Sequence, residues 1–113
     1  MASLHGKIDL KIVGKRAEEG ARKGLVLAVN HVLQVSNQRV PNETGDLERS
    51  GRATVDDLRG AVSYDTPYAV RQHEELTWRH SRGGRAKYLE SALVDTADEV
   101  RDIVAAQVRR ALR

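Results

Sequence analysis

Two patterns of apolar residues follow one another at the start of the chain. Between residues 7 and 13 apolar and polar side chains alternate, with Ile8, Leu10 and Ile12 on one side, which predicts a half-buried strand. From residue 15 to residue 39 apolar positions recur every three or four residues, which predicts one long amphipathic helix. The apolar stripe of this helix consists of Ala17, Ala21, Leu25, Ala28, Val32 and Val35.

Glycine and proline limit the long helix and weaken its middle. Gly14 interrupts the strand pattern before it, and Pro41 ends it because the residue before a proline disfavours helical backbone angles. Gly20 and Gly24 each cost the helix about 1 kcal/mol relative to alanine. The apolar run Leu25–Val29 widens the stripe, so we expect the helix to be buried against a sheet or shared with a neighbouring subunit.

The residues after the long helix predict a turn. Pro41 and Gly45 are typical of turns, and Thr44 or Asp46 is positioned to cap a short helical turn that carries Leu47. The turn connects the long helix to the strands that follow it.

A β-hairpin is predicted next. Strands over residues 53–55 and 60–64 pair across a turn at Asp56-Asp57. Aspartates suit this turn because their side chains can bond nearby backbone N–H groups.

The C-terminal half predicts a short helix, a loop and a final helix. Pro67 is placed in the first turn of the short helix, where proline is favoured. The loop that follows, residues 77–87, carries four cations and no acid. These cations are Arg79, Arg82, Arg85 and Lys87, and we call the segment 79–87 the basic loop. A helical period then continues from about residue 86 to residue 112, with basic residues at its end, where they complement the helix dipole.

These elements predict an α+β fold in one domain that spans residues 1–113. In it the long N-terminal helix and the C-terminal helix pack on a small, mainly antiparallel sheet, and the basic loop is flexible.

The composition excludes several kinds of chemical site. The 113 residues have a net charge of +3 and include no cysteine. Disulfides, thiolate metal sites and cysteine nucleophiles are therefore excluded. The longest apolar run is too short to span a bilayer and the N-terminus lacks an apolar signal core, so we expect a soluble intracellular protein.

The segment His73–Thr77 has part of a metal-binding pattern. A zinc-protease helix needs H-E-x-x-H, which places two histidines on one helix face, but the fifth position here is Thr77. The next histidine, His80, is seven residues after His73, and glycines follow closely. We therefore expect no metal and no other cofactor, and we interpret the segment as a polar helix end.

The basic loop is the other candidate for chemistry. Its Gly83-Gly84 pair precedes a helix and could offer backbone N–H groups to a phosphate, but the P-loop pattern is absent. Two interpretations remain for the four cations. They contact the phosphates of a DNA duplex without reading its sequence, or they order against the acids of a partner protein.

Catalysis by a nucleophile or an acid/base pair has little support. No activation motif such as G-x-S-x-G surrounds Ser50, Ser63, Ser81 or Ser91. Glu74 and Glu75 are adjacent, so on a helix they would point about 100° apart and make a poor acid/base pair. We therefore expect that the protein is not an enzyme.

Three motifs follow one another in a fixed order. The first is a P-x-x-T-G-x-L-x-x-S stretch, with Pro41, Thr44, Gly45, Leu47 and Ser50. The second is a P-Y-A step before His or Glu, with Pro67, Tyr68, Ala69, His73 and Glu74. The third is the step into the last helix, with Lys87, Tyr88, Leu89, Ala92 and Leu93.

This ordered set resembles the small neck proteins of long-tailed double-stranded DNA bacteriophages, a family that includes minor capsid, head–tail joining and tail-completion proteins. The resemblance covers residues 8–112, and the segment 76–87 is more basic than the family pattern.

The resemblance implies a structural virion protein. It implies a homo-oligomeric ring, a hexamer, in the neck between the portal complex and the tail tube. Its partners would be the adaptor or stopper proteins above and the terminator or tail tube below, and genomic DNA would pass through the ring. The basic loop would then face this DNA or a neighbouring subunit. The alternatives are a tail terminator ring and a small, non-enzymatic nucleic-acid-binding module that uses the basic loop.

The motif residues also have structural roles that we expect. Gly45 suits a positive φ angle in its turn, and Pro67 fixes the break between strand and helix. Tyr64 and Tyr68 are expected to bury their rings and keep their hydroxyls on a polar partner. The expected core residues of the motifs are Leu47, Leu89 and Leu93.

Overall fold

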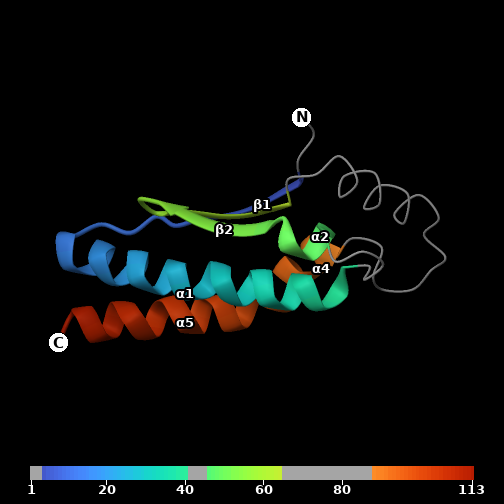
Figure 1. The fold of residues 1–113 in the computed structure, drawn as a ribbon. Helices are drawn as coiled ribbons and strands as arrows, with labels where there is room; N and C mark the ends of the chain where they lie inside the picture. Colours follow the sequence, from blue (N-terminus) through green and yellow to red (C-terminus); the bar gives the residue numbers. More distant parts are fainter. Residues whose placement is uncertain (1–3, 41–45, 65–87) are drawn as a thin grey trace.

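The computed structural model describes residues 4–40, 46–64 and 88–113, and their fold is α+β, as the sequence predicts. Helix α1 (Lys15–Arg39) lies in the middle, with a small sheet on one side and helix α5 (Ala97–Ala111) on the other (Figure 1). The other elements are β1 (Leu4–Asp9), α2 (Asp46–Arg49), β2 (Gly51–Asp56), β3 (Arg59–Tyr64) and α4 (Tyr88–Asp95). No helix in these described ranges combines the length and the apolarity needed to cross a membrane.

The sheet has three strands, and β3 is its central strand. Both neighbours, β1 and β2, pair with β3 in antiparallel register. Burial alternates along β3, so Gly60, Val62 and Tyr64 are buried while the residues between them are partly exposed. Because side chains alternate between the two faces of a strand, one face of the sheet packs on α1 and the other is exposed to solvent.

The predicted strand over residues 7–13 is wrong in its position. Strand β1 spans Leu4–Asp9, because it pairs only with the six residues of β3. A last backbone hydrogen bond joins Leu10 N to the carbonyl oxygen of Leu58 at 2.8 Å. Beyond that point no residue of the hairpin lies opposite the chain, so Ile12 belongs to an irregular link and packs on the core around α5.

The predicted hairpin is present, but its turn is shifted by one residue. Asp56 pairs with Arg59, so the two-residue turn is Asp57-Leu58 and not Asp56-Asp57. Asp57 has a φ of 54°, a left-handed conformation that aspartate tolerates better than most residues. The predicted helical turn before the hairpin is also present, as α2.

The predicted limits of the long helix are confirmed. Gly14 precedes it with a φ of 110°, and Val40 ends it in an extended conformation, as expected before a proline. The run Leu25–Val29 divides between two environments: Leu25, Ala28 and Val29 are buried, whereas Val26 and Leu27 are exposed.

Gly20 and Gly24 let α1 and α5 approach each other closely. A Cβ atom built on Gly24 would lie 2.7 Å from the Cα atom of Val104, and one on Gly20 would lie 2.7 Å from the carbonyl oxygen of Gln107. No real Cβ atom makes such contacts, so the absence of side chains sets the distance between the two helices. The two glycines therefore lower the helix propensity of α1, and in return they allow its backbone to pack closely on α5.

The predicted C-terminal helix is two helices in the described range 88–113. Thr96 separates α4 from α5, with φ −101° and ψ 6°. Its hydroxyl donates to the carbonyl oxygen of Ala92 at 2.7 Å, a back-bond of the kind that bends helices. As a result α4 packs on the core between the sheet and the end of α1, while α5 runs back along α1 toward the N-terminal end of that helix.

Candidate interaction site

Most of the residues that the sequence singles out lie outside the described residues. These include the four cations of the basic loop, Arg79, Arg82, Arg85 and Lys87, together with Pro41, Thr44, Gly45, Pro67, Tyr68, Ala69, His73 and Glu74. The predicted helix after Pro67 lies outside them as well. The motif residues whose side chains are described are Ser50, Tyr64, Tyr88, Leu89, Ala92 and Leu93.

The two tyrosines on either side of the segment 65–87 are in contact. Tyr64 is the last residue of β3 and Tyr88 is the first residue of α4, and both are fully buried. Their rings pack edge to face, with centroids 5.4 Å apart and planes at 87°. The structure therefore brings the two attachment points of the segment that carries the basic loop together in the core. We call this pair the tyrosine stem.

The hydroxyl of Tyr64 has polar partners on α1. Its oxygen lies 2.8 Å from Ser36 Oγ and 2.6 Å from Asn37 Oδ1. Ser36 is itself fully buried, so this hydrogen bond satisfies a polar group that would be costly to leave unpaired in the core. The expectation that Tyr64 buries its ring and keeps its hydroxyl on a polar partner is confirmed, and so is the core position of Leu89.

Arg39 fixes α4 to the end of α1 beside the tyrosine stem. Its Nη1 atom donates to Ser91 Oγ at 2.9 Å and lies 2.8 Å from Asp95 Oδ2. The side chain of Arg39 is only 15% exposed, so this ion pair is less screened by solvent than a pair on the open surface. Together, the stem and Arg39 hold the base of the segment 65–87 on a packed part of the fold.

We expect the protein to lose stability between about pH 10 and pH 12. Burial raises the pKa of Tyr64 from 10.0 to about 12, against a smaller lowering by its hydrogen bond to Ser36. Burial, and after it the charge of an ionised Tyr64, also raises the pKa of Tyr88. The folded state holds these protons more tightly than the unfolded state. The resulting contribution to the free energy of unfolding is fully present below pH 10. It is lost as the pH rises through the folded-state pKa, and the loss is roughly 3 kcal/mol for Tyr64.

Urea unfolding at a series of pH values measures this loss, and absorbance at 295 nm follows tyrosine ionisation. Replacing Tyr64 with phenylalanine provides the control, since this variant is expected to lose less stability over the same pH range. Ionisation of all tyrosines near pH 10 with the helical signal intact would contradict the prediction.

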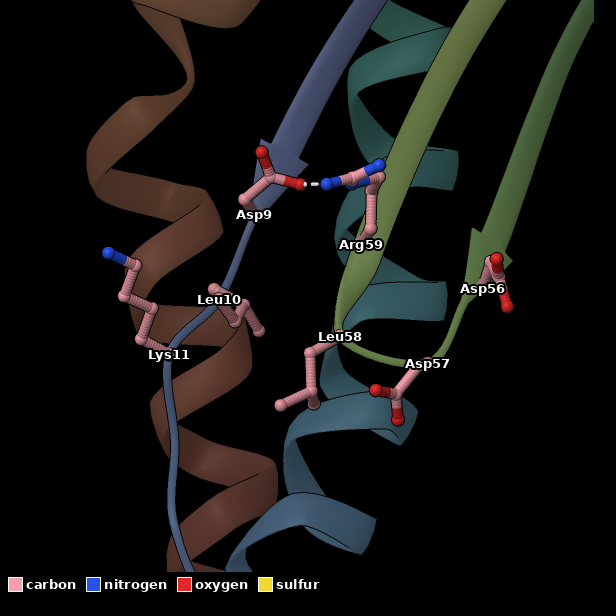
Figure 2. A pocket seen from close by; sticks show the side chains of 7 residues that line it. All are labelled: Asp9, Leu10, Lys11, Asp56, Asp57, Leu58 and Arg59. Carbon is pink, nitrogen blue, oxygen red and sulfur yellow. Dashed lines mark hydrogen bonds and ion pairs between the residues drawn. The ribbon is translucent and has the colours of Figure 1, made fainter.

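A polar hollow lies at the tip of the hairpin (Figure 2). Asp9 pairs with Arg59 at 2.7 Å across the sheet, and Asp57 pairs with Arg22 of α1 at 3.1 Å. The carboxylates of Asp9, Asp56 and Asp57 stand apart from one another. In the part of the chain that the structure describes, no group of three or more His, Cys, Asp or Glu side chains is placed to hold a metal ion. The charges of the hollow therefore connect β1, the hairpin and α1.

A second hollow is an apolar groove, which sequence reasoning missed. It has a volume of about 460 Å³ and lies between α5 and the link after β1. The residues that line it are Leu10, Ile12, Ala97, Val100, Arg101, Val104, Ala105, Val108 and Arg109. The valines at positions 100, 104 and 108 recur every fourth residue, which gave a signal for one apolar face of the helix. Nothing in the sequence indicates that Leu10 and Ile12 lie beside this face.

Comparison of the chain with protein-family models, with curated proteins and with solved structures finds no match.

Proposed function

We propose that the protein is a structural subunit of a bacteriophage head-to-tail connector. In this role copies of the chain form a ring in the neck of the virion, join the DNA-filled head to the tail and line the passage for DNA. The observation that carries the proposal is the order of three sequence motifs, which resembles small neck proteins over residues 8–112. Tail completion and tail termination are the two places in the neck that this resemblance suits.

The tyrosine stem supports the proposal. Tyr88 and Leu89 of the third motif pack in the core with Tyr64, which is the last residue of the strand that precedes the second motif. A connector must hold its contact segments on a scaffold that does not yield when DNA or a neighbouring ring presses on them. A stem of buried aromatic rings, with Arg39 beside it, provides such a base for the segment that contains the basic loop.

The proposal gives the basic loop an electrostatic role and the chain no catalytic step. Arg79, Arg82, Arg85 and Lys87 would contact DNA phosphates in the passage or acidic groups of the next subunit or ring. Either contact is independent of DNA sequence and is weakened by salt.

The test of the function is electron microscopy of particles assembled without this protein. We expect DNA-filled heads separate from tails, because a missing connector interrupts only their joining. Intact particles with normal tails would contradict the proposal.

Particles assembled with the Arg82→Glu and Arg85→Glu double variant test the basic loop, and we expect most heads to remain without tails.

A matched control reverses two exposed arginines outside the basic loop. Arg52→Glu with Arg110→Glu makes the same change in net charge. We expect this control to join heads and tails normally. Equal joining by both double variants would show that the basic loop has no part in the contact.

A further inference from the structure

Strand β2 forms one edge of the sheet. It pairs with β3 on one side, and no described strand pairs with its other side. Leu58, directly before β3, accepts a hydrogen bond from Leu10 on the β1 side. Because successive residues of a central strand direct their backbone groups to opposite neighbours, Arg59, Ala61 and Ser63 direct theirs toward β2.

This alternation decides which backbone groups of β2 are free. The residues opposite Arg59, Ala61 and Ser63 are Asp56, Thr54 and Arg52, so their backbone groups belong to the pairing with β3. The N–H and C=O groups of the residues between them point to the open edge. Such a row of backbone groups is a template for pairing with another strand.

The outer face of β2 carries two charges without a partner. Its exposed side chains are Arg52, Thr54 and Asp56. Within the part of the chain that the structure describes, no ion pair or side-chain hydrogen bond engages Arg52 or Asp56. Arg59, which lies opposite Asp56, turns its guanidinium to Asp9 of β1 instead (Figure 2). The two charges of β2 can therefore meet a partner.

The sequence of β2 is complementary to itself. When two copies run antiparallel about Thr54, Arg52 of each copy lies opposite Asp56 of the other. Opposite charges and a pair of threonines across strands both stabilise such pairing. In the same register Ala53 lies opposite Val55, and these are the residues whose backbone groups point to the open edge. A shift of the register by two residues would remove both charge pairs.

The same pairing brings the two α1 helices to one side of the joined sheet. Ala53 and Val55 both pack toward the core on α1, and residues that exchange backbone hydrogen bonds point to the same face of a sheet. The inner faces of the two copies therefore continue into each other.

A flank of α1 extends this surface below the open edge. Arg22 pairs with Asp57 at the tip of the hairpin, and the Leu33 side chain lies against Gly51 at the start of β2. Val26, one turn after Arg22, lies between them on the same flank and is 46% exposed. A second copy at this edge would cover Val26 with its own α1 flank.

The other edge strand, β1, is less suitable. Its exposed residues in the described range are Lys7 and Asp9. Asp9 is already paired with Arg59, so Lys7 has no free acid to meet on a second β1. Charge complementarity selects β2.

We propose that two copies of the chain pair through β2, antiparallel about Thr54, with Arg52 of each copy on Asp56 of the other. The contact joins one surface to itself, so it closes at two copies and leaves no β2 edge open. Covering this edge prevents open-ended pairing of strands between chains. The inference concerns the free chain, goes beyond the proposed connector function and does not depend on it.

Cysteine cross-linking tests the register, because the chain has no native cysteine. In the proposed pairing the two Thr54 Cα atoms lie about 4.5 Å apart, which is within the range of a disulfide. We expect Thr54→Cys to form disulfide-linked dimers about tenfold faster under mild oxidation than Lys7→Cys does. Lys7→Cys is the matched control, since it places an exposed cysteine on the same face of the other edge strand.

The cross-linking outcomes separate the possible occupants of the edge. Equal rates for the two variants would mean that β2 is not a preferred contact. A mixture that yields mainly dimers of Thr54→Cys with Lys7→Cys would assign the edge to β1 of a neighbouring copy. Either result, or no dimer at all, overturns the proposal.

A charge exchange tests the two ion pairs. We expect the wild-type chain to be a monomer–dimer equilibrium in sedimentation velocity, and Arg52→Glu or Asp56→Arg to weaken the dimer about tenfold by opposing like charges. The double variant Arg52→Glu with Asp56→Arg restores both pairs in the exchanged sense and should regain the affinity of the wild type. Lys7→Glu changes the net charge as Arg52→Glu does and should associate as the wild type does.

The recovery by the double variant is the decisive result. A role of these residues in the folding of the hairpin would not make two opposite charge changes compensate between copies. Equal association of wild type and Arg52→Glu, no recovery in the double variant, or a wild-type chain that stays monomeric at its solubility limit overturns the proposal.

This contact and the proposed function fail separately. A ring joins two different surfaces of each copy, so loss of the β2 pairing leaves the ring contacts intact, and Arg52→Glu remains a control for the joining of heads and tails. Separate heads and tails in particles lacking the protein, together with no Thr54→Cys dimer, would retain the connector function and remove the pairing. Normal particles without the protein, together with the dimer, would retain the pairing and remove the connector function.

Discussion

Replacing Gly24 with leucine is expected to destabilise the protein by at least about 4 kcal/mol, which is close to the whole stability of a small domain. Even a single Cβ atom at this position would lie 2.7 Å from Val104 Cα and 3.3 Å from the Val104 carbonyl oxygen. These are backbone atoms, so no rotation of a side chain relieves the contact. The two helices must move apart, and the buried contacts of Ala21 and Ala28 with α5 are then lost.

The matched control for this variant is Lys23→Leu. Lys23 is the preceding residue of the same helix and is exposed, so the same new side chain should change stability by less than about 0.5 kcal/mol. Urea denaturation followed by circular dichroism measures both variants. The Gly24→Ala variant tests whether the free energy of unfolding rises or falls when a single methyl group is added. Helix propensity alone predicts a gain of about 1 kcal/mol, whereas the packing with α5 predicts a net loss. A more stable Gly24→Ala variant would contradict the close approach of the helices.

Replacing Tyr64 with alanine is expected to cost about 3–5 kcal/mol. The ring is fully buried, packs edge to face on Tyr88, and carries the hydroxyl that pairs with Ser36 and Asn37. Its removal leaves a cavity at the tyrosine stem and an unpaired buried hydroxyl on Ser36. Since the stem holds both ends of the segment 65–87, this variant should also impair particle joining at temperatures where the fold is marginal.

Tyr64→Phe separates the ring from its hydroxyl. The ring contact with Tyr88 is retained, so the cost should be only that of the lost hydrogen bonds, about 1–2 kcal/mol. The free energy of unfolding from urea titrations compares the two variants at neutral pH. A loss for Tyr64→Phe as large as that for Tyr64→Ala would show that the hydroxyl network, and not the packing of the rings, stabilises the stem.

The contact surfaces differ in how far the sequence indicates them. The basic loop is visible in the sequence because four cations without an acid form a continuous segment. The apolar groove is not visible, because Leu10 and Ile12 are far in sequence from the α5 residues that complete it.

The sequence by itself determined the elements whose signals are local. The limits of α1 follow from Gly14, the residue before Pro41 and a helical period between them, and the hairpin follows from short apolar runs around two aspartates. Only the tertiary structure decided where β1 ends, because a strand extends only as far as its partner β3 reaches. The tertiary structure also decided that the last helix is divided at Thr96. It decided the role of Gly20 and Gly24 as well, because that role depends on the close approach of α5. Local backbone preferences depend on residues only a few positions apart, whereas packing depends on segments that meet only in the folded chain.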